Sequence, residues 1–418
     1  MTAAARKNSP PAQSGFAAPH VLRALLKTQP TPFYLYDAAG LETACREISG
    51  AFSWNEGFQL YFPVRMNPNP AILAVLHRAG CGALCASGTE LQLAARAGLT
   101  GEQIIYAPMA WQEDGAAFAA REGAPYLMDS EDAPPAYAPR TLLLSLNPGG
   151  MLTLDGRPVW DLSRLKLGMK VDSALRLLQQ ASASSHGETK LGLAMHLRDQ
   201  EAEPERFLAA AELLFQTASQ AYQRSGVRVD ACMIVGGLGA CYRKLDKAVD
   251  LAALSSRVKG LYETHLAPLG LHPVLQLAPG RWIAAKSGVL VSRVLAVKRR
   301  EVPLAILDVS CAQFLREIAF GSAHRVTAPF ARGEDTALTQ LAGCLADPRD
   351  HFPGSYVLPP LAPGSCVMIH DVGADGHSFG NHYGGSPLCA EFLLETDGTV
   401  REIFRRQTHD ALLAQYGL

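Results

Sequence analysis

Several short apolar runs between residues 60 and 281 end in a residue that can take part in chemistry. Arg65 follows LYFPV, His196 follows LGLAM, and Arg281 follows LQLAPG. A guanidinium can bind a carboxylate or phosphate through two hydrogen bonds, and an imidazole can accept or donate a proton near neutral pH. If these runs are neighbouring parallel strands, the closing residues meet at the carboxyl ends of the strands and form one site.

A glycine-rich segment, VGGLG at Val235–Gly239, follows another apolar run. Without side chains, Gly236, Gly237 and Gly239 allow backbone N–H groups to approach an anion, which Arg281 can bind as well. Glycines that only form a turn would give the same sequence pattern. At this point both explanations, an anion site and a plain turn, stay open.

Histidine positions allow structural explanations too. His196 has the pattern of a histidine satisfied within a core as well as that of a functional one. The segment HDVGADGHSFGNHYGG, residues 370–385, holds three histidines on a glycine-rich stretch. Their spacing matches no common ligand pattern, so we expect no metal site.

The apolar runs indicate the elements that would position these residues. They alternate with stretches of helical period, among them Ala71–His77, Glu90–Ala97 and a segment from Pro204 to Arg224. Buried strands alternating with helices predict an α/β fold, a (β/α)₈ TIM barrel, with a doubly wound open sheet as the rival. The eight expected strands are Leu60–Arg65, Ala83–Ser87, Ile104–Met109, Tyr126–Asp129, Thr141–Asn147, Leu191–Leu197, Cys232–Gly237 and Val274–Arg281.

The pattern changes after about residue 282, where strand-like runs follow one another with few helices. We therefore expect a flexible N-terminal arm over 1–30, a strand over 31–38 that joins the β domain, a barrel over 39–281 and a C-terminal β domain over 282–418. The strands expected in that last domain are Val289–Val297, Leu304–Val309, Cys366–Asp371 and Ala390–Leu394.

Composition narrows the class of protein. Of 418 residues, 48% are hydrophobic and 18% charged, with 38 Lys+Arg against 39 Asp+Glu. That balance argues against a disordered chain and against nucleic-acid binding through bulk basic charge. No apolar run approaches the roughly 18 residues of a membrane span, and the nine cysteines show no CxxC pair. We expect a cytoplasmic protein that binds neither membrane nor nucleic acid.

A series of motifs resembles one known family. They are TPFYLYD (Thr31–Asp37), NPNPAIL (Asn67–Leu73), CASGTEL (Cys85–Leu91), KLGM (Lys166–Met169), GGLG (Gly236–Gly239), PGR (Pro279–Arg281), LDVSCAQFLREIAFGSAH (Leu307–His324) and IHDVGADGHSFGNHYGGSPLCAEFLL (Ile369–Leu394). In type and order they are similar to the fold-type III decarboxylases that use pyridoxal phosphate (PLP), in particular diaminopimelate decarboxylase and its ornithine and arginine relatives. The resemblance implies the alanine-racemase-type barrel followed by a β domain.

The resemblance fails at the residue that anchors the cofactor. The family reads Val-Lys-Ala-Asn where this chain reads Val64-Arg65-Met66-Asn67, so Arg65 replaces the Schiff-base lysine. A guanidinium stays protonated and has no free lone pair with which to attack an aldehyde. We therefore do not expect covalently anchored PLP.

Other differences from the family have the same effect. The family glutamate that pairs with the pyridinium nitrogen corresponds to Ala278, an aspartate after the second barrel strand corresponds to Leu84, and a tyrosine that contacts the cofactor phosphate corresponds to Asp375. A carboxylate beside a phosphate repels it.

Other family positions survive. By resemblance His196 stacks on the cofactor ring, and Arg281 with the three glycines holds its phosphate. Arg316 and Asp347 lie on the substrate side, and Cys344 matches a catalytic cysteine supplied across a dimer interface. The resemblance thus implies a homodimer that binds a small amino-acid-like ligand.

Three functions stay open. The first is a repurposed enzyme, in which Arg65 holds a carboxylate or phosphate and His196, Cys344 and Asp375 are candidate base, nucleophile and acid. Its cofactor is unknown, with iron or haem as candidates, and the resemblance suggests siderophore or other natural-product biosynthesis. The second is a non-catalytic homologue that binds a partner or small ligand. The third is an enzyme that holds PLP without a covalent bond, through the glycines, Arg281 and His196.

Overall fold

Eight parallel strands form a closed barrel in the computed structural model, which describes residues 19–110, 112–132, 135, 137–184, 188–197, 203–242, 248–317, 324–331 and 335–418. Around the barrel the strand order is β10-β11-β2-β3-β4-β5-β6-β9. The strands are β2 (Gln59–Pro63), β3 (Cys81–Cys85), β4 (Ile104–Tyr106), β5 (Tyr126–Met128), β6 (Thr141–Leu146), β9 (Lys190–His196), β10 (Ala231–Val235) and β11 (Val274–Ala278). Each overlaps one predicted run, so the barrel is confirmed and the open sheet is excluded.

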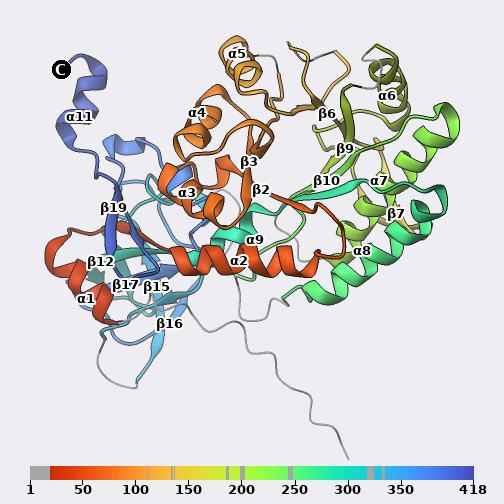
Figure 1. The fold of residues 1–418 in the computed structure, drawn as a ribbon. Coiled ribbons are helices and arrows are strands. Elements are labelled where there is room, and N and C mark those ends of the chain that lie inside the picture. The colour runs from red at the N-terminus through yellow and green to blue at the C-terminus, as the bar shows by residue number, and fades with distance from the viewer. Residues whose placement is uncertain are drawn as a thin grey trace, which may run out of the picture.

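Helices surround the barrel, on the right in Figure 1. Polar side chains cap the start of several of them; for example, Asn69 accepts a hydrogen bond from the N–H of Ala71 at 3.0 Å, and Ser87 accepts one from the N–H of Glu90 at 3.2 Å. Pro204 begins the longest, which ends at Gly226 in the left-handed conformation. The helices are α2 (Ala38–Ala51), α3 (Pro70–Arg78), α4 (Gly88–Arg96), α5 (Glu113–Glu122), α6 (Val171–Ser184), α7 (Pro204–Ser225), α8 (Leu251–His265) and α9 (Gly280–Ala284).

The second domain is a nine-stranded sheet with the main order β16-β15-β13-β12-β1-β18-β19, in which β17 pairs with β12 and β14. The early strand β1 (Phe33–Asp37) lies in its middle, antiparallel to β12 and parallel to β18. The other strands are β12 (Gly288–Lys298), β13 (Leu304–Leu307), β14 (Val326–Thr327), β15 (Ala337–Ala342), β16 (Tyr356–Leu358), β17 (Cys366–His370), β18 (Ala390–Leu394) and β19 (Val400–Phe404).

The structure differs from the sequence-based expectation at the N-terminus. Residues 1–18 of the expected arm lie outside the described residues, but Pro19–Thr28 form helix α1 rather than a loose segment. Leu22 and Leu25 are buried, and they pack in one cluster with Phe33 and Phe392 of the sheet. Burial of that apolar face holds the helix against the β domain (Figure 1).

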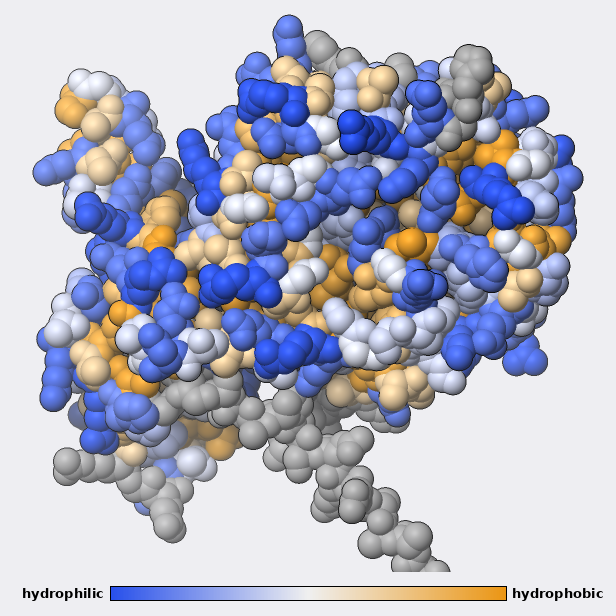
Figure 2. Space-filling view, in the orientation of Figure 1, coloured by the Kyte–Doolittle hydropathy of each residue, from blue (hydrophilic) through white to orange (hydrophobic). Residues whose placement is uncertain are grey.

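A hairpin that was not predicted extends from the barrel after β6. Its strands are β7 (Met151–Leu154) and β8 (Arg157–Asp161), joined by Asp155 and Gly156, both with positive φ. The short helix α11 (His409–Leu413) follows β19. In Figure 2 an open notch separates this helix from the barrel, and the face shown is mostly hydrophilic. Among the described residues, no helix is long and apolar enough to cross a membrane.

Side chains that point into the barrel form their own apolar cluster. It includes Leu127 of β5, Leu143 of β6 and Ala194 of β9. Because side chains alternate along a strand, the residue two positions further on each strand also faces the barrel axis, one layer nearer the carboxyl end. The polar residues Asp129, Ser145 and His196 occupy these positions.

Candidate functional site

Arg65 stands at the carboxyl end of β2, in the single turn η2 (Val64–Met66), and is exposed. Its charge acts on two groups on other elements: it adds to the burial that lowers the pKa of His196, and it partly opposes the burial that raises the pKa of Glu90. Glu90 itself is held at the start of α4, where its Oε2 accepts a hydrogen bond from the N–H of Ala86 at 2.7 Å. The barrel mouth therefore brings a guanidinium close to an imidazole and a carboxylate.

His196 is the last residue of β9 and is partly buried. Its Nδ1 lies 3.2 Å from the hydroxyl of Ser145, a residue with no exposed surface. Burial, and then the charge of Arg65, lower its pKa to about 4. The imidazole is therefore neutral at physiological pH and can accept a hydrogen bond or a proton.

Replacing Arg65 with Gln is expected to raise the pKa of His196 from about 4, because the nearby cation that opposes protonation is removed. The pKa should stay below 6.5, since burial is the larger cause. A pH titration of the His196 ring by NMR measures the shift. Arg78→Gln, at an exposed position ending α3, is the control that should change nothing. An unchanged pKa in Arg65→Gln would contradict this arrangement.

The predicted glycine cradle lies directly after β10. Gly236 and Gly237 both have φ of 79°, and a Cβ on Gly237 would fall 2.5 Å from Leu197 Cδ1. Glycine is therefore required by the path of the chain. The N–H of Gly236 donates to the carbonyl of Ala278 at 3.0 Å, which leaves this group engaged within the barrel. Gly239 is buried.

Asp375 binds two arginines that the sequence analysis assigned to other tasks. Its Oδ2 accepts hydrogen bonds from Arg281 Nε at 2.9 Å and from Arg316 at 2.8 Å. The side chains of Arg281, Asp375 and Arg316 are only 8%, 4% and 0% exposed. The guanidinium of Arg316 also stacks on Tyr242, 4.7 Å from the ring centre. We call Arg281, Asp375 and Arg316 the buried ion cluster.

Hydrogen bonds fix the β-domain loop that carries Asp375 against the turn that carries Arg65. The N–H of Asp375 donates to the carbonyl of Met66 at 2.9 Å, and Ser378 donates to the same oxygen at 3.1 Å. Asn67 returns a bond to the carbonyl of Gly373 at 3.1 Å. Both domains therefore contribute to the mouth of the barrel, with Arg65 and Asp375 on adjoining backbone segments.

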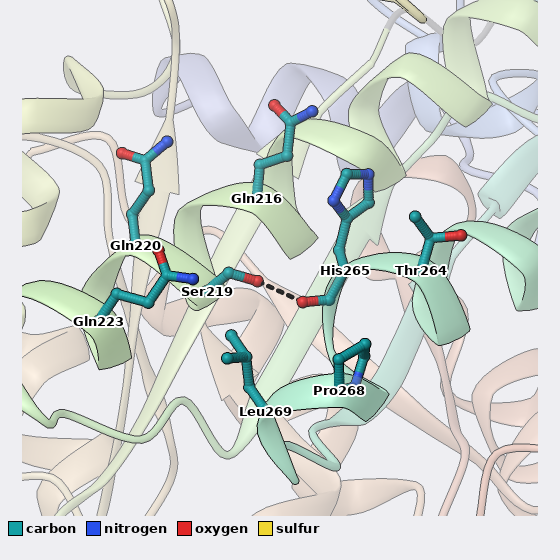
Figure 3. Close-up of a pocket in the computed structure, with 8 residues that line it drawn as sticks. All are labelled: Gln216, Ser219, Gln220, Gln223, Thr264, His265, Pro268 and Leu269. Atoms are coloured by element: carbon teal, nitrogen blue, oxygen red, sulfur yellow. Dashed lines mark hydrogen bonds between the residues drawn. The ribbon is translucent and has the colours of Figure 1, made fainter.

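A surface hollow of about 340 Å³ lies elsewhere, between α7, α8 and the single turn η4 (Ala267–Leu269) (Figure 3). Glutamines line one wall and Pro268 and Leu269 the other, while the Ser219 hydroxyl donates to the carbonyl of His265 at 2.6 Å. It belongs to the outer ring of helices, away from the strand ends. Within the described ranges, no three His, Cys, Asp or Glu side chains gather as a metal site.

A family comparison decides what this architecture belongs to. The family described as "Pyridoxal-dependent decarboxylase, C-terminal sheet domain" matches residues 33–373. The chain belongs to this family of pyridoxal-dependent decarboxylases.

Relatives within the family share less than a third of the residues. Protein TabA of Pseudomonas amygdali pv. tabaci is 29% identical, over 93% of this chain and 92% of its own. Diaminopimelate decarboxylase of Methanothermobacter thermautotrophicus is 26% identical, over 92% of this chain and 91% of its own. The crystal structure of diaminopimelate decarboxylase from Helicobacter pylori, complexed with L-lysine, superimposes with a TM-score of 0.81. It is 23% identical over 95% of this chain and 100% of that chain, and it shows the shared fold.

The residues at the mouth do not fit the cofactor that the family name implies. Arg65 supplies no amine that can form an imine with PLP. The carboxylate of Asp375 occupies the position on Arg281 where a phosphate oxygen would accept a hydrogen bond, at 2.9 Å. A phosphate brought to the same guanidinium would meet a negative charge in a buried setting, where the repulsion is poorly screened. Asp375, considered as an acid, is instead placed as an ion-pair partner.

The remaining predicted residues, Cys344 and Asp347, make their described contacts within the β domain. Cys344 follows β15 and its Sγ lies 3.8 Å from the carbonyl of Asp308; burial and the charge of Asp350 raise its pKa, which favours the thiol. Asp347 binds Arg349 at 2.8 Å and the hydroxyl of Tyr383. The structure does not bring either residue into contact with Arg65 or His196 of the same chain.

Asp129 closes a predicted strand but was assigned no role, and Ser145 was not singled out, although both face the barrel axis beside His196. The runs that contain them were predicted as strands, so period-two counting from the apolar interior positions would have found them. Arg316, predicted to face the substrate, lies instead under Asp375 with no exposed surface.

Proposed function

We propose that this chain is a repurposed member of the decarboxylase family that binds an amino-acid-derived carboxylate at the barrel mouth and forms no Schiff base with PLP. The observation that supports this proposal most is that two residues at the barrel mouth, Arg65 and Asp375, differ from the family pattern. An exposed guanidinium stands at the end of β2, and one carboxylate of the chain itself pairs with both Arg281 and Arg316.

The arrangement suits a zwitterion. Arg65 can bind the carboxylate through two hydrogen bonds, and the ion-pair geometry fixes the orientation of the ligand. The neutral ring of His196 can accept a hydrogen bond from the ammonium group, and Arg65 acts on the carboxylate of Glu90 as well. The ligand-binding residues therefore come from three different strand ends, as in other barrels.

A non-catalytic homologue is the second candidate, favoured by the same ion pair between Arg281 and Asp375, because it engages a predicted cofactor contact within the chain. Non-covalent PLP would have to displace Asp375 from Arg281. The main proposal includes a homodimer and a role in siderophore or other natural-product biosynthesis, which the family resemblance supports. It also includes a cytoplasmic location, which the apolar and cysteine patterns of the sequence support.

Calorimetric titration with L-lysine and with meso-diaminopimelate tests the proposal. We expect wild type and Arg78→Gln to bind at least one probe alike and Arg65→Gln to bind it at least about tenfold more weakly, since one charge-assisted contact is worth about 1.5–3 kcal/mol. With PLP added, we expect no release of CO₂ from diaminopimelate. CO₂ release, or binding that is indifferent to Arg65, would refute the proposal. Binding without turnover of any common amino acid would favour the non-catalytic homologue.

A further inference from the structure

Three polar side chains face the barrel interior near the carboxyl ends of three neighbouring strands. Strands β5 and β6 pair with Met128 opposite Leu144, so Asp129 continues the register opposite Ser145. Strands β6 and β9 pair with Ser145 opposite Ala194, and His196 lies two residues further on the same inward face. The carboxylate of Asp129, the hydroxyl of Ser145 and the imidazole of His196 therefore follow one another from strand to strand around the barrel.

We propose that Ser145 and Asp129 are positioning residues that fix the tautomer of His196, with the proton on Nδ1 and a lone pair on Nε2 facing the ligand at the mouth. The part of this inference that concerns the ligand rests on the function proposed above. The part that concerns the tautomer stands on the contacts of the ligand-free protein.

The direction of the hydrogen bonds follows from what each group can donate. The strand register places Asp129 opposite Ser145, and an ionised carboxylate only accepts, so we assign the one proton of the Ser145 hydroxyl to Asp129. The serine oxygen is then an acceptor for His196, 3.2 Å from Nδ1, which must carry the proton. Among the described residues Ser145 is the hydrogen-bond partner of the ring, so this bond decides the tautomer.

The surroundings of Asp129 support the ionised form. Its Oδ1 accepts a hydrogen bond from the N–H of Gly168 at 2.9 Å. Burial raises the pKa of Asp129, and this bond, the Ser145 side chain and the charge of Lys166 oppose that rise and so favour the ionised form. The close fit of the loop matters too, since a Cβ on Gly168 would lie 2.6 Å from the carbonyl oxygen of Leu146.

When Nδ1 carries the proton, Nε2 is the hydrogen-bond acceptor of the His196 ring. The charge of Arg65 acts on the same ring and lowers its pKa. A ligand ammonium can donate to Nε2 while its carboxylate binds the guanidinium. The other tautomer would present an N–H to the ammonium group, donor against donor. We therefore assign Ser145 and Asp129 a role in selecting an amine-bearing ligand, exercised through His196.

Asp129→Asn is the sharpest test, because the side chain keeps its shape while the hydrogen bonds from residue 129 through Ser145 to His196 reverse their direction. Its amide oxygen can still accept from Gly168, and its NH₂ group donates to Ser145, which then donates to Nδ1 and moves the ring proton to Nε2. Proton-detected ¹⁵N NMR of the histidine rings in the full chain reads the tautomer, with His196→Gln identifying the signal. We expect mainly Nδ1–H in wild type and mainly Nε2–H in Asp129→Asn.

Ser145→Ala is the second variant, in which we expect loss of the single preferred tautomer; Ser173→Ala, at a buried serine of α6, should leave the His196 signal as in wild type. Nε2–H in wild type, or an unchanged tautomer in Asp129→Asn, would overturn the inference. The dissociation constant for L-lysine should rise about tenfold in Asp129→Asn. If L-lysine and diaminopimelate fail to bind wild type while the tautomers behave as stated, the proposed function fails and the positioning role stands.

Discussion

Asp375→Ala is expected to lower the free energy of unfolding by about 3–5 kcal/mol, because it leaves the charges of Arg281 and Arg316 buried without their common carboxylate. Both guanidinium groups are almost fully buried, at 8% and 0% exposed, so water cannot replace the lost partner. Urea unfolding followed by far-ultraviolet circular dichroism measures the loss.

A surface pair supplies the control for this prediction. Lys259 and Glu263 on α8 lie 3.7 Å apart and are 47% and 60% exposed, so Glu263→Ala should cost less than about 0.5 kcal/mol. Added phosphate should stabilise Asp375→Ala more than wild type, since an anion can enter the vacated position and binding to the folded state raises stability. A variant as stable as wild type would show that the buried ion cluster is not a structural requirement.

The double variant Arg65→Lys/Asp375→Asn is expected to gain a covalent PLP adduct that the wild type lacks. The new lysine supplies an amine, and the neutral amide removes the negative charge from the position on Arg281 that a phosphate would approach. A like-charge contact at about 4 Å costs about 4 kcal/mol at an effective dielectric of 20, of which rearrangement relieves part. We therefore expect Arg65→Lys alone to bind PLP about 100-fold more weakly than the double variant.

Borohydride reduction followed by peptide mass spectrometry locates the adduct. Arg78→Lys/Asp375→Asn is the matched control, with the new lysine at the opposite end of a helix from the mouth, and no adduct is expected at residue 78. If the double variant forms no adduct at residue 65, these two positions do not account for the loss. A pyridoxyl adduct on Lys166 or another mouth lysine of the wild type would contradict the proposed function.

The barrel could be predicted because its strands carry a strong local signal. Buried parallel strands are apolar throughout, and each of the eight runs ended in a break that placed the strand within a few residues. The hairpin β7–β8 was not predicted, although Asp155-Gly156 is a strong turn signal. The strands were predicted from continuous apolar runs, and short exposed strands do not form such runs. Helix α1 was missed because its two buried leucines follow a segment rich in Ala, Pro and Ser.

The site was harder to predict than the fold. Arg65 and His196 could be predicted because they follow or end barrel strands. The pairing of Asp375 with Arg281 and Arg316 could not be predicted. Asp375 meets Arg281 across the domain boundary and Arg316 within the β domain. Such contacts between residues far apart in the sequence produce no periodic pattern that could predict them. Ser145 looked like one small residue in an apolar strand, and its function becomes visible only when the register of β5, β6 and β9 is known.

The place of β1 in the second sheet has a consequence for how the chain is made. This strand is synthesised before the barrel, yet its parallel neighbour β18 is synthesised only after the whole barrel. Until then one edge of β1 has no native partner, and a bare apolar edge invites pairing with other chains. A nascent chain is therefore at risk of aggregation until β18 has emerged and paired with β1, and we expect chaperone dependence to concentrate in that interval.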